Sequence, residues 1–266
     1  MLGYPIGLIG GGNMGSAILS GALRHSVVLP ENVSLSDPCP EKTESFRTQG
    51  VYVTNDNREV ARRSDILILA VKPQMFDEVL PPLASITGGK CVVSIAAGIS
   101  TAYIKKRMPN AHVIRVMPNT PLLVGRGITA LVREKDVPDE YFEAVRELFS
   151  AAGRTMTVNE DQLNGVIALS GSSPAYFFRL ISAMAEEGER MGLSRDQAIW
   201  LAAGTMEGAA AMVQGSGKTP EELTRQVCSP GGTTLAALSA FDDGGLNDMV
   251  SDAMRRCVKR ADELGR

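Results

Sequence analysis

A glycine-rich turn near the N-terminus is the feature that most constrains how this chain can fold. Residues 10–15 (GGGNMG) have the spacing G-x-G-x-x-G and follow a short apolar run at residues 5–9. Residues 13–24 have apolar side chains at helical spacing, so the turn is predicted to join a buried strand to a helix. In that context the first glycine permits a tight turn, the second lets the backbone approach a pyrophosphate, and the third lets the helix pack closely. The helix N-terminus attracts the anion, so the segment predicts a dinucleotide site, with a glycine-rich turn that binds nothing as the plainer alternative.

Further apolar segments alternate with stretches of helical character through the first 160 residues. Strands are expected at residues 33–36, 66–71, 91–95 and 112–116, with weaker candidates at 129–132 and 155–158. The run at 66–71 (ILILAV) does not alternate with polar residues, which is typical of a parallel strand that is covered on both faces. The order of elements therefore predicts an α/β domain with a doubly wound parallel sheet over residues 1–160.

The strand signals stop after about residue 160, and segments rich in Ala, Met and Leu follow. They cover residues 161–191, 195–215, 220–227, 231–241 and 246–264. This pattern predicts an all-helical domain over residues 161–266. The last segment carries an apolar stripe at i, i+3, i+4 spacing, which could pack on its own domain. Because about 100 residues of helix are too few to bury so many apolar faces, we expect these helices also to form a homodimer interface.

Composition excludes several classes of protein. The formal net charge is −3, which disfavours a nucleic-acid surface and a basic membrane-binding patch. No apolar run approaches the ~20 residues that a membrane helix needs. The four cysteines are far apart and form no C-x-x-C pair, so we expect no disulfide framework, no structural zinc and a cytoplasmic location. Residues 215–219 (GSGKT) lack the earlier glycine of a phosphate-binding P-loop and lie between helices, so we expect an interhelical loop there.

The helical half holds few side chains that can move a proton near neutral pH. Residues 155–217 contain no His and no Lys, and structural roles are expected for His25 and His112, the two histidines of the chain. A dehydrogenase that acts on alcohols needs such a group. A protonated C=N bond already accepts hydride, so its site needs orientation, a carboxylate anchor and a hydrogen-bonding group near nitrogen. The missing base therefore favours an imine over a hydroxy acid as substrate.

Two polar clusters in the helical half could supply that anchor. They are residues 170–174 (SGSSP) and residues 229–234 (SPGGTT). The second cluster has the form of a helix N-terminus, with a proline, glycines and hydroxyls before an apolar run. Its free N–H groups would bind a small carboxylate. The plainer alternative is an ordinary capped turn.

The end of the second expected strand bears on the choice of cofactor. Asp37 lies about 20 residues beyond the glycines, where an acidic residue usually binds the ribose hydroxyls, repels a 2′-phosphate and so favours NADH. Ser36, Lys42 and Asn57 could instead serve a phosphate, with Asp37 as a turn residue before Pro38. Both NADH and NADPH stay open on the sequence.

Taken together, these segments resemble the pyrroline-5-carboxylate reductase family over nearly the whole chain. The resemblance rests on residues 9–16 (IGGGNMGS), 70–74 (AVKPQ), 94–100 (SIAAGIS), 115–121 (RVMPNTP), 169–177 (LSGSSPAYF) and 229–234 (SPGGTT). It implies an N-terminal Rossmann domain, a dimer made by interleaved C-terminal helices, and frequent assembly of five dimers into a decamer. The implied reaction is reduction of L-1-pyrroline-5-carboxylate to L-proline by hydride transfer from NADPH or NADH, the last step of proline biosynthesis.

The resemblance also implies roles for individual positions. The implied cofactor residues are Gly10, Gly12, Asn13, Met14 and Gly15 at the pyrophosphate, Ser36, Asp37 and Asn57 at the adenosine, Ala70, Val71, Lys72 and Pro73 in the cleft, and Ala96, Ala97, Gly98 and Asn119 near the nicotinamide. The implied substrate residues are Ser229, Gly232, Thr233 and Thr234. Thr234 is the implied catalytic group, with its hydroxyl on the ring nitrogen, in a loop that faces the cofactor domain of the partner subunit.

Three positions depart from the family pattern. Ser173 replaces a usual glycine, Arg225 replaces a common acidic residue, and Asp37 is unusual for relatives that prefer NADPH. Two other functions are weighed against the reductase. An imine reductase with another cyclic substrate would share every cofactor motif, and a non-catalytic NAD(P)-binding regulator is disfavoured because both glycine motifs are intact.

Overall fold

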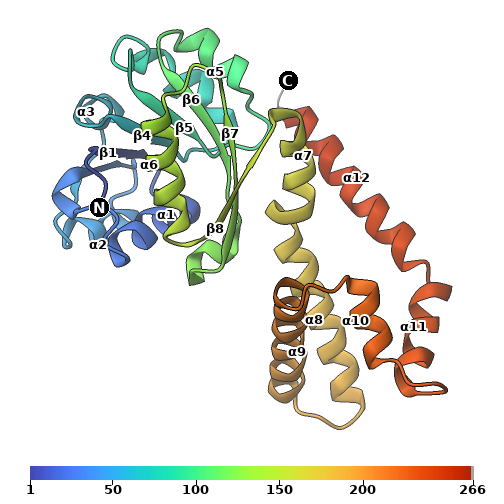
Figure 1. Ribbon diagram of the computed structural model, residues 1–266. Coiled ribbons are helices and arrows are strands. Elements are labelled where there is room, and N and C mark those ends of the chain that lie inside the picture. Colours follow the sequence, from blue (N-terminus) through green and yellow to red (C-terminus); the bar gives the residue numbers. More distant parts are fainter. Residues whose placement is uncertain (265–266) are drawn as a thin grey trace. The chain divides into compact units, whose positions relative to one another are not determined.

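The computed structural model describes residues 1–264, which fall into two units (Figure 1). The first unit consists of Met1–Ser172 together with the end of the chain from Cys257 onward, and the second consists of Ser173–Arg256. The chain therefore leaves the first unit once and returns to it. As a result, the last helix begins in the second unit and ends in the first.

The first unit is built on an eight-stranded sheet with the order β3-β2-β1-β4-β5-β6-β7-β8. The strands are β1 (Ile6–Ile9), β2 (Val33–Ser36), β3 (Tyr52–Thr54), β4 (Ile66–Leu69), β5 (Cys91–Ser94), β6 (His112–Met117), β7 (Gly127–Arg133) and β8 (Gly153–Val158). Neighbouring strands are parallel, except that β6 and β7 are antiparallel, with Met117 opposite Ala130. The predicted doubly wound Rossmann-type sheet is confirmed. Strand β3 and the reversed direction of β7 were not expected.

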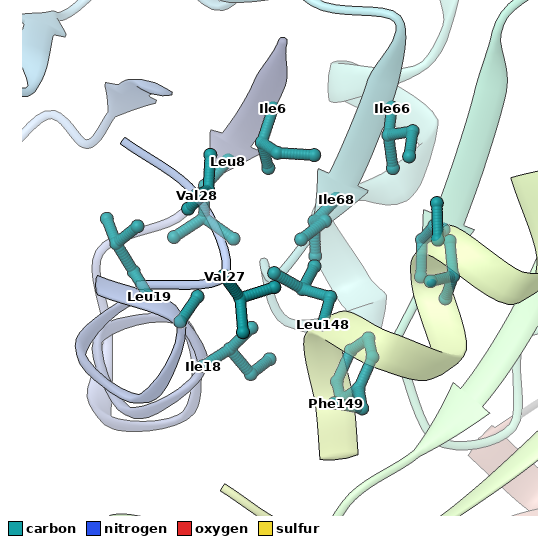
Figure 2. Packing of buried hydrophobic residues seen from close by; sticks show 14 of the residues in the cluster. Ile6, Leu8, Ile18, Leu19, Val27, Val28, Ile66, Ile68, Leu148 and Phe149 are labelled. Atoms are coloured by element: carbon teal, nitrogen blue, oxygen red, sulfur yellow. The ribbon is translucent and has the colours of Figure 1, made fainter. Parts of the chain in front are cut away.

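Helices cover both faces of this sheet because its central strands are apolar on both sides. The helices of the first unit are α1 (Asn13–Arg24), α2 (Glu44–Arg47), α3 (Asn57–Arg63), α4 (Phe76–Val79), α5 (Thr101–Arg107), α6 (Asp139–Ser150) and α7 (Leu163–Val166). On one face, Leu8 and Ile68 pack against Ile18 of α1 and Phe149 of α6 (Figure 2). The strand residues that alternate with Leu8 and Ile68 along the chain point to the other face of the sheet. There they pack against α3, α4 and α5. Each fully buried side chain of this size contributes roughly 1.5–3 kcal/mol.

A smaller cluster closes the β7–β8 end of the sheet. Met117 and Val132 pack there against Leu163 and Ile167, and Ala261 near the end of the chain joins them. Ile167 belongs to a π-helical turn, Ile167–Gly171, that interrupts the helix expected from residue 161. Such turns are rare and often occur at functional sites.

A partly buried ion pair ties three separate elements of the first unit together. Nη1 of Arg115, on β6, donates to Oε1 of Glu160 over 2.9 Å, and the N–H of Thr101 at the start of α5 donates to the same oxygen over 2.7 Å. Burial raises the pKa of Glu160, but these two donors outweigh it and hold that pKa below its ordinary value. Burial also lowers the pKa of the Arg115 guanidinium. The pair thus depends on groups that lie far apart in the sequence.

The second unit is entirely helical within its described residues, as predicted. Its helices are α8 (Ser173–Arg190), α9 (Arg195–Gly215), α10 (Pro220–Val227), α11 (Thr233–Asp243) and the first part of α12 (Leu246–Leu264). Helices α8 and α9 pack against each other through small side chains such as Ala185 and Ala198, which are buried. Large apolar side chains stay outside: Phe178 is 65% exposed and Trp200 is 76% exposed. Of the residues 215–219, Gly215 ends α9 and residues 216–219 form the expected loop before α10, with Thr219 as the cap of α10.

Candidate functional site

A cleft of about 640 Å³ lies at the carboxyl ends of β1, β2 and β4. These three strands are neighbours in the sheet, so the turns that follow them meet at one edge. The cleft is lined by eight of the predicted cofactor residues: Gly10, Gly12, Ser36, Asp37, Asn57, Ala70, Val71 and Lys72. It also has walls that the sequence analysis did not identify, formed by Asn55, Arg58, Met75, Glu78, Val79 and Pro82. In open α/β sheets this edge is where ligands bind.

The glycine turn has the shape of a phosphate cradle. Gly10 has a φ of +105°, and a Cβ added there would lie 2.7 Å from the carbonyl oxygen of Ala70. A Cβ added to Gly12 would meet no atom within 4 Å, so any side chain at this position would project into the cleft that Gly12 lines. Gly12 also caps α1 and supplies no side-chain acceptor for the first-turn N–H groups of the described helix. Those donors and the open space fit the pyrophosphate of a dinucleotide.

The carboxylate of Asp37 is fixed against this turn. Its Oδ2 accepts from the N–H of Gly11 over 2.8 Å, and its Oδ1 accepts from the N–H of Cys39 over 2.9 Å. Nζ of Lys42 lies 3.5 Å from the same Oδ1. Asp37 is buried, with 9% of its surface exposed, whereas Lys42 is exposed. The acidic residue at the end of β2 is therefore part of the cleft wall.

The hydroxyl of Ser36 is directed to a neighbouring turn. Its Oγ donates to Oδ1 of Asn57 over 2.7 Å, and Asn57 begins α3 directly after the capping residue Asp56. This bond joins the end of β2 to the start of α3. It fixes the Asn57 amide at the rim of the cleft.

The remaining predicted cofactor residues do not line the cleft. Asn13, Met14 and Gly15 form the first turn of α1, Pro73 begins the turn after β4, and Ala96, Ala97 and Gly98 form the loop after β5. The side chain of Asn119, just after β6, is engaged on both sides. Its Nδ2 lies 3.2 Å from both the carbonyl oxygen and Oγ of Ser170, and its Oδ1 accepts from the N–H of Ile128 over 2.9 Å. The structure thus connects Asn119 with the π-helical turn.

The second polar cluster forms the N-terminus of α11 in the second unit. Gly231 has a φ of +68°, and the N–H of Gly232 donates to the carbonyl oxygen of Ser229 over 2.9 Å. Gly232 is the capping residue and offers no side-chain acceptor in the described chain, so Thr233 and Thr234 present the first N–H groups of the helix. Ser229 and Thr233 are exposed, and Thr234 is half-buried. The expected helix N-terminus is present, and its donors are open to an anion.

Both histidines occupy positions away from the cleft walls. His25 caps the C-terminal end of α1, and His112 begins β6, with its ring 6.0 Å from that of Tyr141. Within residues 1–264, none of the helices combines the length and apolarity that crossing a bilayer requires. The same residues contain no group of three or more His, Cys, Asp or Glu side chains placed to hold a metal ion.

A parallel sheet whose first strand leads through an open glycine cradle into a helix defines the class of Rossmann-type dinucleotide-binding proteins. Two family models match this chain, one in each half. Residues 5–98 match the model for "NADP oxidoreductase coenzyme F420-dependent", and residues 160–264 match the model for "Pyrroline-5-carboxylate reductase dimerisation".

Full-length relatives identify the family. A pyrroline-5-carboxylate reductase from Methanosarcina acetivorans is 39% identical, with 100% of both chains covered. The structure of a pyrroline-5-carboxylate reductase from Coxiella burnetii is 34% identical, covers 99% of both chains and superposes with a TM-score of 0.91. The Plasmodium falciparum pyrroline carboxylate reductase crystallised with NADP bound is 27% identical, covers 100% of both chains and gives a TM-score of 0.92. This chain belongs to the pyrroline-5-carboxylate reductase family.

Proposed function

We propose that this protein reduces the cyclic C=N bond of L-1-pyrroline-5-carboxylate to give L-proline, the final step of proline biosynthesis. The observation that carries the proposal is the likeness to pyrroline-5-carboxylate reductases over the whole length of the chain, which includes both the cradle and the start of α11. NADH or NADPH, when bound, supplies the hydride. The residues of the chain bind and orient the two reactants.

The first unit binds the dinucleotide along the sheet edge. The N–H groups of Gly12, Asn13, Met14 and Gly15 hold the pyrophosphate, and Gly10 makes the turn that brings them there. Ser36, Asp37 and Asn57 contact the adenosine end, and Ala70, Val71 and Lys72 line the middle of the cleft, with Pro73 at the start of the turn that follows them. Ala96, Ala97, Gly98 and Asn119 lie near the nicotinamide. Asn119 acts there through its hydrogen bonds to Ser170 rather than by direct contact, since both ends of its amide are engaged.

The start of α11 binds the substrate. The open N–H of Thr233 and the hydroxyl of Ser229 hold its carboxylate at the turn that Gly232 caps, where the N–H of Gly232 is itself bonded to the carbonyl oxygen of Ser229. The hydroxyl of Thr234 hydrogen-bonds to the ring nitrogen. A carboxylate at a helix N-terminus gains from the N–H donors and from the helix dipole. Neither histidine lines the cleft, and an iminium carbon accepts hydride without a base to remove a proton. Orientation and hydrogen bonding at Thr234 are therefore sufficient chemistry for this site.

Oxidation of NADH and of NADPH, each measured with L-1-pyrroline-5-carboxylate, tests the reaction. Turnover with at least one cofactor is expected, and turnover of other cyclic imines alone would replace the proposal with a different imine reductase. Thr234→Ala is expected to lower kcat on the order of 10²-fold without changing the Kd of the cofactor. Thr224→Ala, on the exposed face of α10, is the matched control and should leave kcat unchanged. An equal loss of turnover and cofactor affinity in Thr234→Ala would contradict its role.

The helical unit forms a homodimer. Its large apolar side chains, including Phe178, Trp200 and Met249, are mostly exposed in the single chain, and a second copy would cover them. Five such dimers assemble into a decamer, which is the assembly that the resemblance to the family implies. Sedimentation equilibrium distinguishes one, two and ten copies. Phe178→Glu is expected to dissociate the dimer, whereas Leu123→Glu, which alters an apolar residue of the first unit that is also more than half exposed, should not.

The protein acts in the cytoplasm. The four cysteines are free thiols, which suits a reducing compartment. Fractionation of cells that express the tagged chain tests this location. Recovery in a secreted or membrane fraction would contradict it.

A further inference from the structure

We propose that Asp37 makes NADH the preferred cofactor of this protein. NADH and NADPH differ by a single phosphate, carried by the 2′-oxygen of the adenosine ribose. Asp37 directly follows β2 and lines the cleft, and this is the position from which Rossmann domains contact that ribose. The inference rests on the proposed function and adds to it the choice between the two cofactors.

The carboxylate of Asp37 cannot turn away from the cleft without losing two hydrogen bonds. Its two oxygens accept from the N–H groups of Gly11 and Cys39, over 2.8 and 2.9 Å. Hydrogen bonds to an ionised carboxylate are about twice as strong as those between neutral groups, so this contact fixes the position of the charge. Because Gly11 belongs to the cradle itself, the negative charge is built into the wall that receives the dinucleotide.

The other charges of the cleft do not cancel this fixed one. Three cationic and three anionic side chains line it among the described residues: Lys42, Arg58, Lys72, Asp37, Asp56 and Glu78. Their formal charges sum to zero, but Asp37 is buried whereas the other five are exposed. Exposed charges are screened by water and salt, and buried charges much less. Lys42 is the one nearest to Asp37, at 3.5 Å, and half of its side chain is open to solvent.

The hydroxyl next to Asp37, on Ser36, is not free to bind a phosphate. Ser36 is buried, with 1% of its surface exposed, and its hydroxyl donates to Oδ1 of Asn57 over 2.7 Å. A phosphate monoester carries about −1.5 to −2 charges at pH 7, and beside Asp37 it would meet a like charge. A free 2′-hydroxyl can instead donate a hydrogen bond to the same carboxylate. The wall therefore favours the cofactor without the 2′-phosphate.

Binding of two adenosine fragments to the intact protein tests this preference independently of catalysis. The fragments are 5′-AMP and adenosine 2′,5′-bisphosphate, measured by titration calorimetry. We expect 5′-AMP to bind at least about tenfold more tightly, which corresponds to about 1.4 kcal/mol. The ratio of kcat/KM for NADH over NADPH should favour NADH in the same direction. Equal or tighter binding of the bisphosphate by the unaltered protein would overturn the proposal.

Substitution of the carboxylate assigns the preference to this residue. Asp37→Ser should lower the preference for 5′-AMP over the bisphosphate about tenfold. Loss of the contact with Gly11 would weaken the binding of both fragments, so the ratio of their affinities isolates the effect of the charge. Glu41→Gln is the matched control: it removes one negative charge from an exposed residue that does not line the cleft, and it should leave the ratio unchanged. An unchanged ratio in Asp37→Ser would refute the assignment. If the protein prefers 5′-AMP but does not turn over L-1-pyrroline-5-carboxylate, the proposed function is rejected and the proposed cofactor preference stands.

Discussion

Replacement of Glu160 by alanine tests the partly buried ion pair that joins β6, the start of α5 and the segment after β8. Oε1 of Glu160 accepts from Arg115 over 2.9 Å and from the N–H of Thr101 over 2.7 Å. The side chain of Arg115 is 6% exposed and that of Glu160 is 33% exposed. Truncation of Glu160 therefore leaves a guanidinium buried without its counter-charge.

The expected loss follows from this burial. Removal of one partner from a fully buried ion pair costs about 3–5 kcal/mol. Glu160 is one-third exposed, so water admitted at its place solvates part of the guanidinium, and we expect the lower end, about 3 kcal/mol of unfolding free energy. Glu160→Gln keeps an oxygen acceptor for both donors and loses only the charge, so its cost should be about 1–2 kcal/mol.

Urea unfolding followed by circular dichroism measures these differences. Glu44→Ala is the matched control, because Glu44 and Arg47 form an ion pair at 3.4 Å in which both side chains are more than half exposed. Such a pair is worth less than about 1 kcal/mol. A loss in Glu160→Ala no larger than that of the control would refute the reasoning.

The same pair makes stability depend on pH in a defined direction. The pKa of Glu160 lies below its ordinary value, because hydrogen bonds from Thr101 and Arg115 outweigh the opposing effect of burial. A depressed carboxyl pKa stabilises the fold above the unfolded-state pKa of about 4.3, and this contribution is lost as the pH falls through the folded-state pKa. The stability difference between the unaltered protein and Glu160→Gln should therefore be largest near neutral pH and shrink below about pH 4. A difference that stays constant from neutral to acid pH would contradict this assignment.

Two further substitutions probe the cradle and the end of α3. Gly12→Val should abolish dinucleotide binding while the thermal unfolding temperature stays nearly unchanged, because its side chain enters open cleft space; retained affinity in a calorimetric titration would rule out the cradle. Lys90→Met should lower the unfolding free energy measured in urea by about 1–3 kcal/mol. Nζ of Lys90 donates to the carbonyl oxygens of Ala61 and Ser64 over 2.9 and 2.5 Å, and the substitution removes both hydrogen bonds. A change in unfolding free energy within experimental error would contradict that role.

Strands that are buried on both faces were predictable from the sequence, whereas strand direction and short edge strands were not. All four residues of β4 are buried, and their unbroken apolar run is a strong local signal. Strand β3 has three half-exposed residues, too few to show a period. The apolar pattern of β7 is the same for either direction. The signal that could have identified its direction is the connection from Met117 to Gly127, which is shorter than the dozen or so residues that a parallel crossover needs.

The candidate site divides in the same way between local and distant features. The cradle was predictable because the strand, the glycines and the helix are contiguous. The contact between Asp37 and Gly11 spans 26 residues, and the bond between Asn119 and Ser170 spans 51. Neither is encoded by spacing along the chain. The role of Arg115 was missed because nothing around a single arginine in an apolar strand indicates which distant carboxylate will neutralise it.

The points at which the chain leaves and re-enters the first unit allow the helical unit to be exchanged by protein engineering. The chain departs from the first unit after Ser172 and re-enters at Cys257, and Oγ of Ser172 lies 3.2 Å from Sγ of Cys257. The chain therefore leaves and re-enters the first unit at neighbouring positions, as it does in proteins that tolerate the insertion of a domain. A splice at these positions would exchange one bundle for another, or excise it behind a short linker, and leave the cradle and the sheet intact. Loss of the final turns of α12, in contrast, would remove Ala261 from the first unit's core.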